Sequence, residues 1–177
     1  MKTDSLRRCD ILLFKGEGFT SRLIQWKTKS LYSHVAVVIE PEISLGIESS
    51  TGHQSGVRAF DLRKLDSTQV DLFRVKSEFA VDPEKVISFL VAHLGAPYDW
   101  WGVTWLGALK LFGLQAQANR FQKEKDYFCS ELVYEAFHEG GLDIVPQVEE
   151  AEITSPADIA QSERLDRIES FSEFPAV

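Results

Sequence analysis

Apolar residues in the first half of the chain form short runs that are separated by turn residues. The run Val35 to Ile39 is rich in β-branched side chains, which is typical of a buried strand. Similar runs recur on either side of it. We expect strands near residues 10–14, 34–39, 46–50, 57–60 and 69–75, with a short helix near 21–26.

The second half of the chain carries helical periodicity. Asp82-Pro83-Glu84 supplies an N-cap, a first-turn proline and a first-turn acid, and apolar positions then recur at helical spacing up to Gly95. A second apolar stripe starts at Cys129 and stops at Gly140-Gly141. Strands in the first half and helices in the second predict an α+β fold in which helices pack against an antiparallel sheet. No linker-like stretch divides residues 1–177, so we expect a single domain.

Cys129 opens the second predicted helix. The first turn of a helix presents unpaired N–H groups and the positive end of the helix dipole, and both favour a thiolate over a thiol. Cys129 is therefore a candidate nucleophile. The alternative is a buried structural cysteine, because free cysteine is among the most buried residue types.

His34 and Glu48 lie on neighbouring predicted strands, joined by the turn-forming Glu40-Pro41-Glu42. We expect a hairpin centred on Pro41, in which His34 directly faces Glu48. Directly opposed side chains on one face approach closely enough for a carboxylate to hold an imidazole. A slip of one residue would separate them, so the hypothesis depends on register. In a Cys-His-acid site, the histidine takes the thiol proton and the acid fixes its tautomer. The alternative is a polar pair at a sheet edge.

Five segments in this order resemble a known family. They are Cys9–Phe14, Ser33–Val38, Ile47–Ser49, Gly95–Trp100 and Phe128–Val133. Together they are similar to the circularly permuted NlpC-type papain-like cysteine hydrolases, and most similar to the YaeF/YiiX branch. The permuted order is histidine, acid, cysteine, as in His34, Glu48, Cys129. The tail 154–159 also looks like the family's closing segment, whereas Cys9 stands where the family usually has glycine.

The resemblance implies a permuted papain-like fold with Cys129 as nucleophile, His34 as base and Glu48 as its orienting acid. It implies an amidase or peptidase, with cell-wall-type peptides such as a γ-glutamyl-diaminopimelate link, or lipid-modified amides, as substrates. Tyr98 is a candidate oxyanion donor beside the Cys129 backbone N–H. We include Ser33 and Trp101 among the candidate substrate-binding or oxyanion residues.

Residues 100–114 carry three of the four tryptophans, including Trp101. This segment is either a core helix or the lining of an apolar substrate groove. About 15 apolar-rich residues are too few for a transmembrane span, which needs roughly 20. An interfacial insertion is a further alternative. His53, which follows Gly52 in a predicted loop, is the main rival of His34 as base.

The amino-acid composition of the chain argues against several classes of function. Lys and Arg total 19 against 27 Asp and Glu, a net charge of −8, which disfavours nucleic-acid binding. Two cysteines do not make a disulfide framework, and the apolar run Ile11 to Phe14 is too short for a signal peptide. We therefore expect a cytoplasmic protein without a transmembrane segment. No metal-ligand spacing or phosphate-binding loop appears, so we expect no metal and no cofactor.

Two other functions compete with the amidase. The first is a lipid acyltransferase or thioesterase on the same fold, which would gain support if the tryptophan segment opened onto Cys129. The second is a non-catalytic binding domain in which Cys129 is buried and inert. Composition and motifs leave the substrate, the choice of hydrolase or transferase, the pathway and the oligomeric state open.

Overall fold

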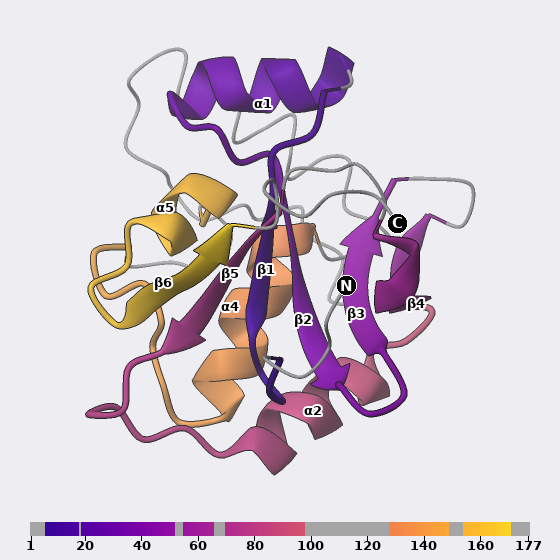
Figure 1. Cartoon of the computed structure of the whole chain (residues 1–177), viewed down its shortest axis with the longest axis vertical. Coiled ribbons are helices and arrows are strands. Elements are labelled where there is room, and N and C mark those ends of the chain that lie inside the picture. The colour runs from indigo at the N-terminus through magenta and orange to yellow at the C-terminus, as the bar shows by residue number, and fades with distance from the viewer. Residues whose placement is uncertain are drawn as a thin grey trace, which may run out of the picture.

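The computed structural model describes residues 6–17, 19–51, 55–65, 70–97, 128–148 and 154–170. In this part of the chain, six strands form one antiparallel sheet (Figure 1). The strands are β1 (Ile11–Phe14), β2 (His34–Glu40), β3 (Leu45–Ser50), β4 (Gly56–Asp61), β5 (Val70–Val75) and β6 (Leu165–Ser170). Their spatial order is β4-β3-β2-β1-β5-β6, which leaves β1 and β2 in the centre of the sheet.

Alternating residues of the central strands face two separate hydrophobic clusters. Ile11 and Leu13 of β1 belong to the larger cluster, whereas Leu12 and Phe14 belong to a smaller one. Successive side chains of a strand point to opposite faces, so the sheet is buried on both sides along β1 and β2. This explains why the two strands read as continuous apolar runs and not as an alternating pattern.

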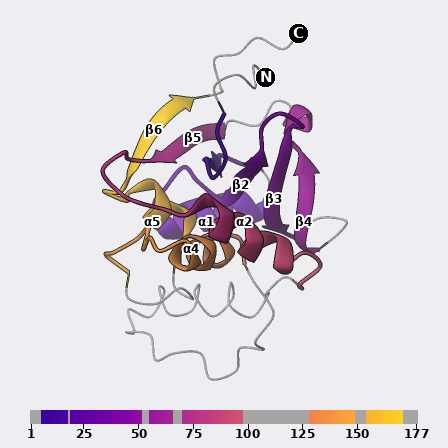
Figure 2. The same ribbon diagram turned by 90° about the horizontal axis from the view of Figure 1, so that it is seen from below.

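Two helices cover the face of the larger cluster. They are α2 (Pro83–Ala92) and α4 (Cys129–Glu139), which contact each other, while α4 also packs against β2 and β3 (Figure 2). Asp82 caps α2 through its side chain, as the sequence predicts. The backbone of Gly140 approaches α2 closely: a Cβ there would lie 2.5 Å from Val86 Cγ2, so only glycine fits.

The predicted α+β class, the antiparallel sheet and the cysteine at a helix N-terminus are confirmed. The short helix near 21–26 exists as the longer α1 (Phe19–Thr28). Three elements were not predicted from the sequence: the 3-10 helix η2 (Leu62–Lys64), the helix α5 (Pro156–Ala160) and the edge strand β6. β6 pairs with β5 and forms one edge of the sheet. Its residues come after the last strand or helix that was predicted from the sequence.

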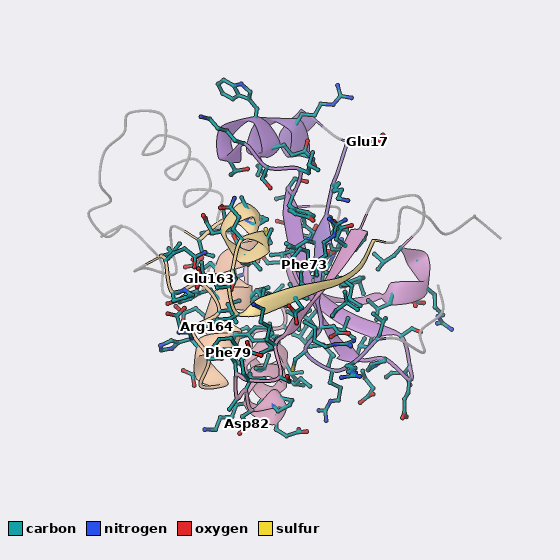
Figure 3. All side chains as sticks on the ribbon, turned by 60° about the vertical axis from the view of Figure 1, so that its left-hand side comes forward. Glu17, Phe73, Phe79, Asp82, Glu163 and Arg164 are labelled. Atoms are coloured by element: carbon teal, nitrogen blue, oxygen red, sulfur yellow. The ribbon has the colours of Figure 1, made fainter. Side chains whose placement is uncertain are left out.

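The turn before β6 is held against the rest of the domain by Arg164. Its Nη1 donates to the carbonyl oxygen of Asp143 at 2.6 Å, and its guanidinium lies 5.4 Å from the ring centre of Phe79 (Figure 3). The Arg164 carbonyl accepts from Lys76 N–H. These contacts join the loop after α4 to the connection between β5 and α2.

The predicted register of the β2–β3 hairpin is wrong. The turn is longer than a hairpin centred on Pro41 allows, because four residues separate the strands and Glu40 pairs with Leu45. A bulge between Val38 and Glu40 then places Ala36 opposite Glu48. His34 therefore does not face Glu48 directly, and the two positions are diagonal neighbours.

Several sequence-based hypotheses lie outside the described residues. They concern Tyr98, Trp101 and the segment 100–114, and His53. Among the residues that the structure describes, none of the helices has both the length and the apolar character needed to cross a bilayer. The cytoplasmic location stays a prediction.

Candidate active site

Cys129 is the first residue of α4 and lies against the sheet with only 6% of its surface exposed. As the N1 residue of the helix, its backbone N–H has no acceptor within the helix. The thiol thus lies beside unpaired backbone donors, where negative charge on sulfur or on a bound substrate oxygen is stabilised. This is the arrangement that the sequence predicts for the nucleophile.

The two residues after Cys129 fix the start of α4. The Ser130 hydroxyl donates to the carbonyl of Thr154 at 2.7 Å, which ties the helix to the segment before α5. Glu131 is buried, and its Oε2 accepts from the N–H of Phe128 at 3.4 Å. Glu131 therefore satisfies a backbone N–H next to Cys129, whereas Ser130 binds the backbone of a segment that is distant in sequence.

His34 is the first residue of β2, at the end of the sheet where α4 begins (Figure 1). Its ring packs against the ring of Phe14, the residue paired with it on β1, with 5.2 Å between ring centres. Its Nε2 lies 2.7 Å from Glu48 Oε2, and Cys129 is near enough to the ring to raise the pKa of His34. With Nε2 engaged by Glu48, Nδ1 is the nitrogen available to the thiol.

The contact between His34 and Glu48 is confirmed, although the register that was expected to produce it is wrong. Side chains that are two residues apart on a strand lie on the same face. A glutamate side chain is long enough to reach a diagonal neighbour across a strand pair. Glu48 thus reaches His34 from the position opposite Ala36.

Arg58 belongs to the same network and was not identified from the sequence. It lies on β4 directly opposite Glu48. Its Nε and Nη2 both donate to Glu48 Oε1, at 2.9 and 2.7 Å, while Oε2 is left to His34. A partial signal was present in the sequence, because Arg58 lies in the predicted strand 57–60, which directly follows the predicted strand 46–50 that carries Glu48.

The electrostatics of this group favour a charged histidine. Burial lowers the pKa of His34, but its interactions with Cys129 and with the Glu48 carboxylate raise it to about 10. Burial raises the pKa of Glu48, and the hydrogen bonds and charges of His34 and Arg58 outweigh this and hold that pKa below its ordinary 4.5. At neutral pH His34 is therefore a positively charged imidazolium next to the negatively charged Glu48 carboxylate.

Cys9, the other thiol of the chain, has a different environment. It is also 6% exposed, and its Sγ lies 3.8 Å from the carbonyl oxygen of Pro83. Burial raises the pKa of Cys9 to about 12, so this thiol stays protonated at neutral pH. It is a small residue of the larger hydrophobic cluster.

Ser33 is placed by its backbone contacts. Its hydroxyl is buried, accepts from Gly16 N–H at 3.2 Å and lies 3.4 Å from the carbonyl of Phe14, to which it donates. It ties the connection after β1 to the start of β2, next to His34. Its hydroxyl is thus engaged by the backbone, and a direct role toward substrate stays a prediction, as do those of Tyr98 and Trp101.

Glu48 has little capacity left to bind a metal. Both of its oxygens already accept hydrogen bonds, from Arg58 and from His34, and a cation there would compete with the guanidinium. Among the residues that the structure describes, no three His, Cys, Asp or Glu side chains are grouped so that they could hold a metal ion.

Neither the family models nor the curated proteins contain a match to this chain. A solved structure does match: the crystal structure of metalloprotein yiiX from Escherichia coli O157:H7, assigned to DUF1105. The two share 17% sequence identity over 96% of this chain and 98% of the other, with a TM-score of 0.69. At this level of identity the likeness concerns the fold, and the chain has a fold similar to that of YiiX.

Proposed function

We propose that this protein is a cysteine hydrolase with a permuted papain-like fold, which cleaves amide bonds through Cys129, His34 and Glu48. The observation that carries the proposal is the position of His34, which contacts a thiol at a helix N-terminus and a carboxylate at the same time. The chain order His34, Glu48, Cys129 and the YiiX-like fold support the permuted arrangement.

The proposed reaction starts from a thiolate and an imidazolium. The sulfur of Cys129 attacks the carbonyl carbon, and the Cys129 backbone N–H donates to the oxygen that becomes negative. As the carbon–nitrogen bond breaks, His34 gives its proton to the leaving amine. Water, deprotonated by His34, then cleaves the thioester and regenerates Cys129. Glu48 holds the imidazole in the orientation that serves both steps.

Substrate class follows from the family resemblance and not from the geometry. We propose cell-wall-type peptides, such as a γ-glutamyl-diaminopimelate link, or lipid-modified amides. The acyltransferase and thioesterase alternatives depend on the tryptophan segment 100–114, which lies outside the described residues. Turnover of a fluorescent acyl-lipid but not of muropeptides would favour them.

The similar protein YiiX is described as a metalloprotein. In this chain the oxygens of Glu48 are both taken by hydrogen bonds, and the described residues bring no group of three metal ligands together. The described donor set thus does not fit a metal at this position, and the proposed reaction is carried by Cys129 and His34.

The experiment is the pH dependence of iodoacetamide alkylation, read by peptide mass spectrometry at Cys129 and Cys9 of the same chain. We expect Cys129 to react well below pH 8 and to lose this reactivity in His34→Ala. Cys9 is the internal control, because burial raises its pKa to about 12. If Cys129 is inert, or is labelled equally with and without His34, the hydrolase proposal is wrong and the binding domain is favoured.

A further inference from the structure

Among the residues that the structure describes, Arg58 donates to Glu48 and to the neighbouring Ser50. Its two N–H groups converge on one oxygen, Oε1, and Nη2 also lies 3.5 Å from the hydroxyl of Ser50 on β3. The Arg58 side chain is 33% exposed, whereas the Glu48 side chain is 10% exposed. The arginine is thus the outer end of a network whose inner end is the histidine.

The geometry divides the two oxygens of Glu48. Oε1 is held by Arg58 on β4, and Oε2 lies 2.7 Å from His34 on β2. Glu48 reaches His34 diagonally, and a diagonal contact uses a longer and less constrained side-chain path than a directly opposed one. A flexible glutamate in this position needs something that fixes its rotamer, and a charged hydrogen bond to a rigid guanidinium does so.

We propose that Arg58 is a positioning residue that fixes the Glu48 carboxylate so that Oε2 points at His34. This inference rests on the proposed function for its catalytic meaning, because an oriented imidazole matters only if His34 serves Cys129. The structural part of the inference can be tested without any cysteine chemistry.

A second role for Arg58 predicts the opposite result. If the arginine only neutralised Glu48, its removal would leave a more strongly attracting carboxylate beside His34, and the pKa of His34 would rise. If the arginine positions Glu48, its removal lets the carboxylate turn away, and the pKa of His34 would fall. The sign of the change therefore separates positioning from charge neutralisation.

The test is an NMR titration of His34 in the full chain, with Arg58→Gln, Arg58→Lys and Arg63→Gln as variants. Arg63→Gln is the matched control, since Arg63 pairs with Asp61 at the end of β4, three residues beyond Arg58. We expect the pKa of His34 to fall by about 1 pH unit in Arg58→Gln, to recover in part in Arg58→Lys, and to stay unchanged in Arg63→Gln. Partial recovery is expected because an ammonium restores the charge but not the planar pair of donors.

Repeating the titration in Cys129→Ala separates this inference from the proposed function. The Arg58→Gln effect should persist there, because it acts through Glu48. Alkylation of Cys129 near pH 6 should also slow by about tenfold in Arg58→Gln. If the pKa of His34 rises or does not change, the positioning role is wrong. If it falls but the alkylation of Cys129 depends on neither His34 nor Arg58, the positioning role holds and the cysteine hydrolase is wrong.

Discussion

Replacing Glu48 by glutamine tests the electrostatic core of the site. Glutamine keeps the shape of the side chain and an oxygen that can accept from His34 Nε2, but it removes the negative charge. A hydrogen bond to a charged group contributes about 1.5–3 kcal/mol, against about 0.5–1.5 kcal/mol for a neutral one. The difference is about 1–1.5 kcal/mol, and a change of 1 pH unit in pKa corresponds to about 1.4 kcal/mol.

The pKa of His34, which is raised to about 10 in the intact site, should therefore fall by about 1 pH unit in Glu48→Gln. The fall is not larger because Cys129 contributes more than Glu48 to the raised value. The assay is nitrogen–proton correlation NMR of the imidazole rings across pH. The chain has four histidines, so the His34 signal is assigned by its loss in His34→Ala.

Asp61→Asn is the control for this titration. It removes one negative charge from a carboxylate that is paired with an arginine, Arg63, and does not touch His34. We expect no change in the titration of His34 in this variant. The reasoning is refuted if His34 in the wild-type chain titrates near its ordinary 6.5, or if Glu48→Gln and Asp61→Asn have the same effect.

Four further outcomes follow from the same contacts. Cys129→Ala should lower the pKa of His34 more than Glu48→Gln does, because Cys129 is the larger of its two raising causes, and the same NMR titration measures this. The folded pKa of Glu48 lies below its ordinary 4.5, so the contribution of Glu48 to stability is present above pH 4.5 and is lost as the pH falls through the folded pKa. In urea unfolding, the difference in the free energy of unfolding between wild type and Glu48→Gln should therefore be smaller near pH 3 than near pH 7. Cys9 has a φ of 64°, so Cys9→Gly should change the free energy of unfolding by less than about 1 kcal/mol and Cys9→Val should cost more, since a β-branched residue is strained there; a glycine variant as unstable as the valine variant would contradict this. Leu132→Ala, in the fully buried first turns of α4, should cost about 2–5 kcal/mol in urea unfolding, and a cost below 1 kcal/mol would show that α4 is not packed as described.

Long, strongly patterned elements could be predicted from the sequence. Asp82-Pro83 marks the start of α2 because an N-cap and a first-turn proline act locally, without help from tertiary structure. β2 reads as a buried strand because both of its faces meet apolar clusters. β6 carries no such pattern: it is an edge strand with exposed Asp166 and Arg167, and only its pairing with β5 defines it. Pairing is a tertiary property, and the local sequence does not reveal it.

Cys9 shows how a local departure from a family pattern gains a physical meaning. The resemblance places a glycine at this position, and the backbone here has a positive φ that glycine adopts without strain. The chain therefore adopts a left-handed conformation at a residue other than glycine, the residue type that favours it. The resemblance indicates that glycine is usual at this position, and the structure supplies the reason, which is the positive φ of the backbone.

The contact between His34 and Glu48 was predicted from a register that proved wrong, and the reason is the two-residue period of a strand. A register that differs by two residues keeps both side chains on one face, so the pairing of the two functional groups survives the error. What changes is the geometry. A directly opposed acid could hold the imidazole by itself, whereas a diagonal one depends on a third strand, and Arg58 on β4 occupies the position from which that support can come. Sequence periodicity thus identifies which residues share a face, and the register decides which further residue the site requires.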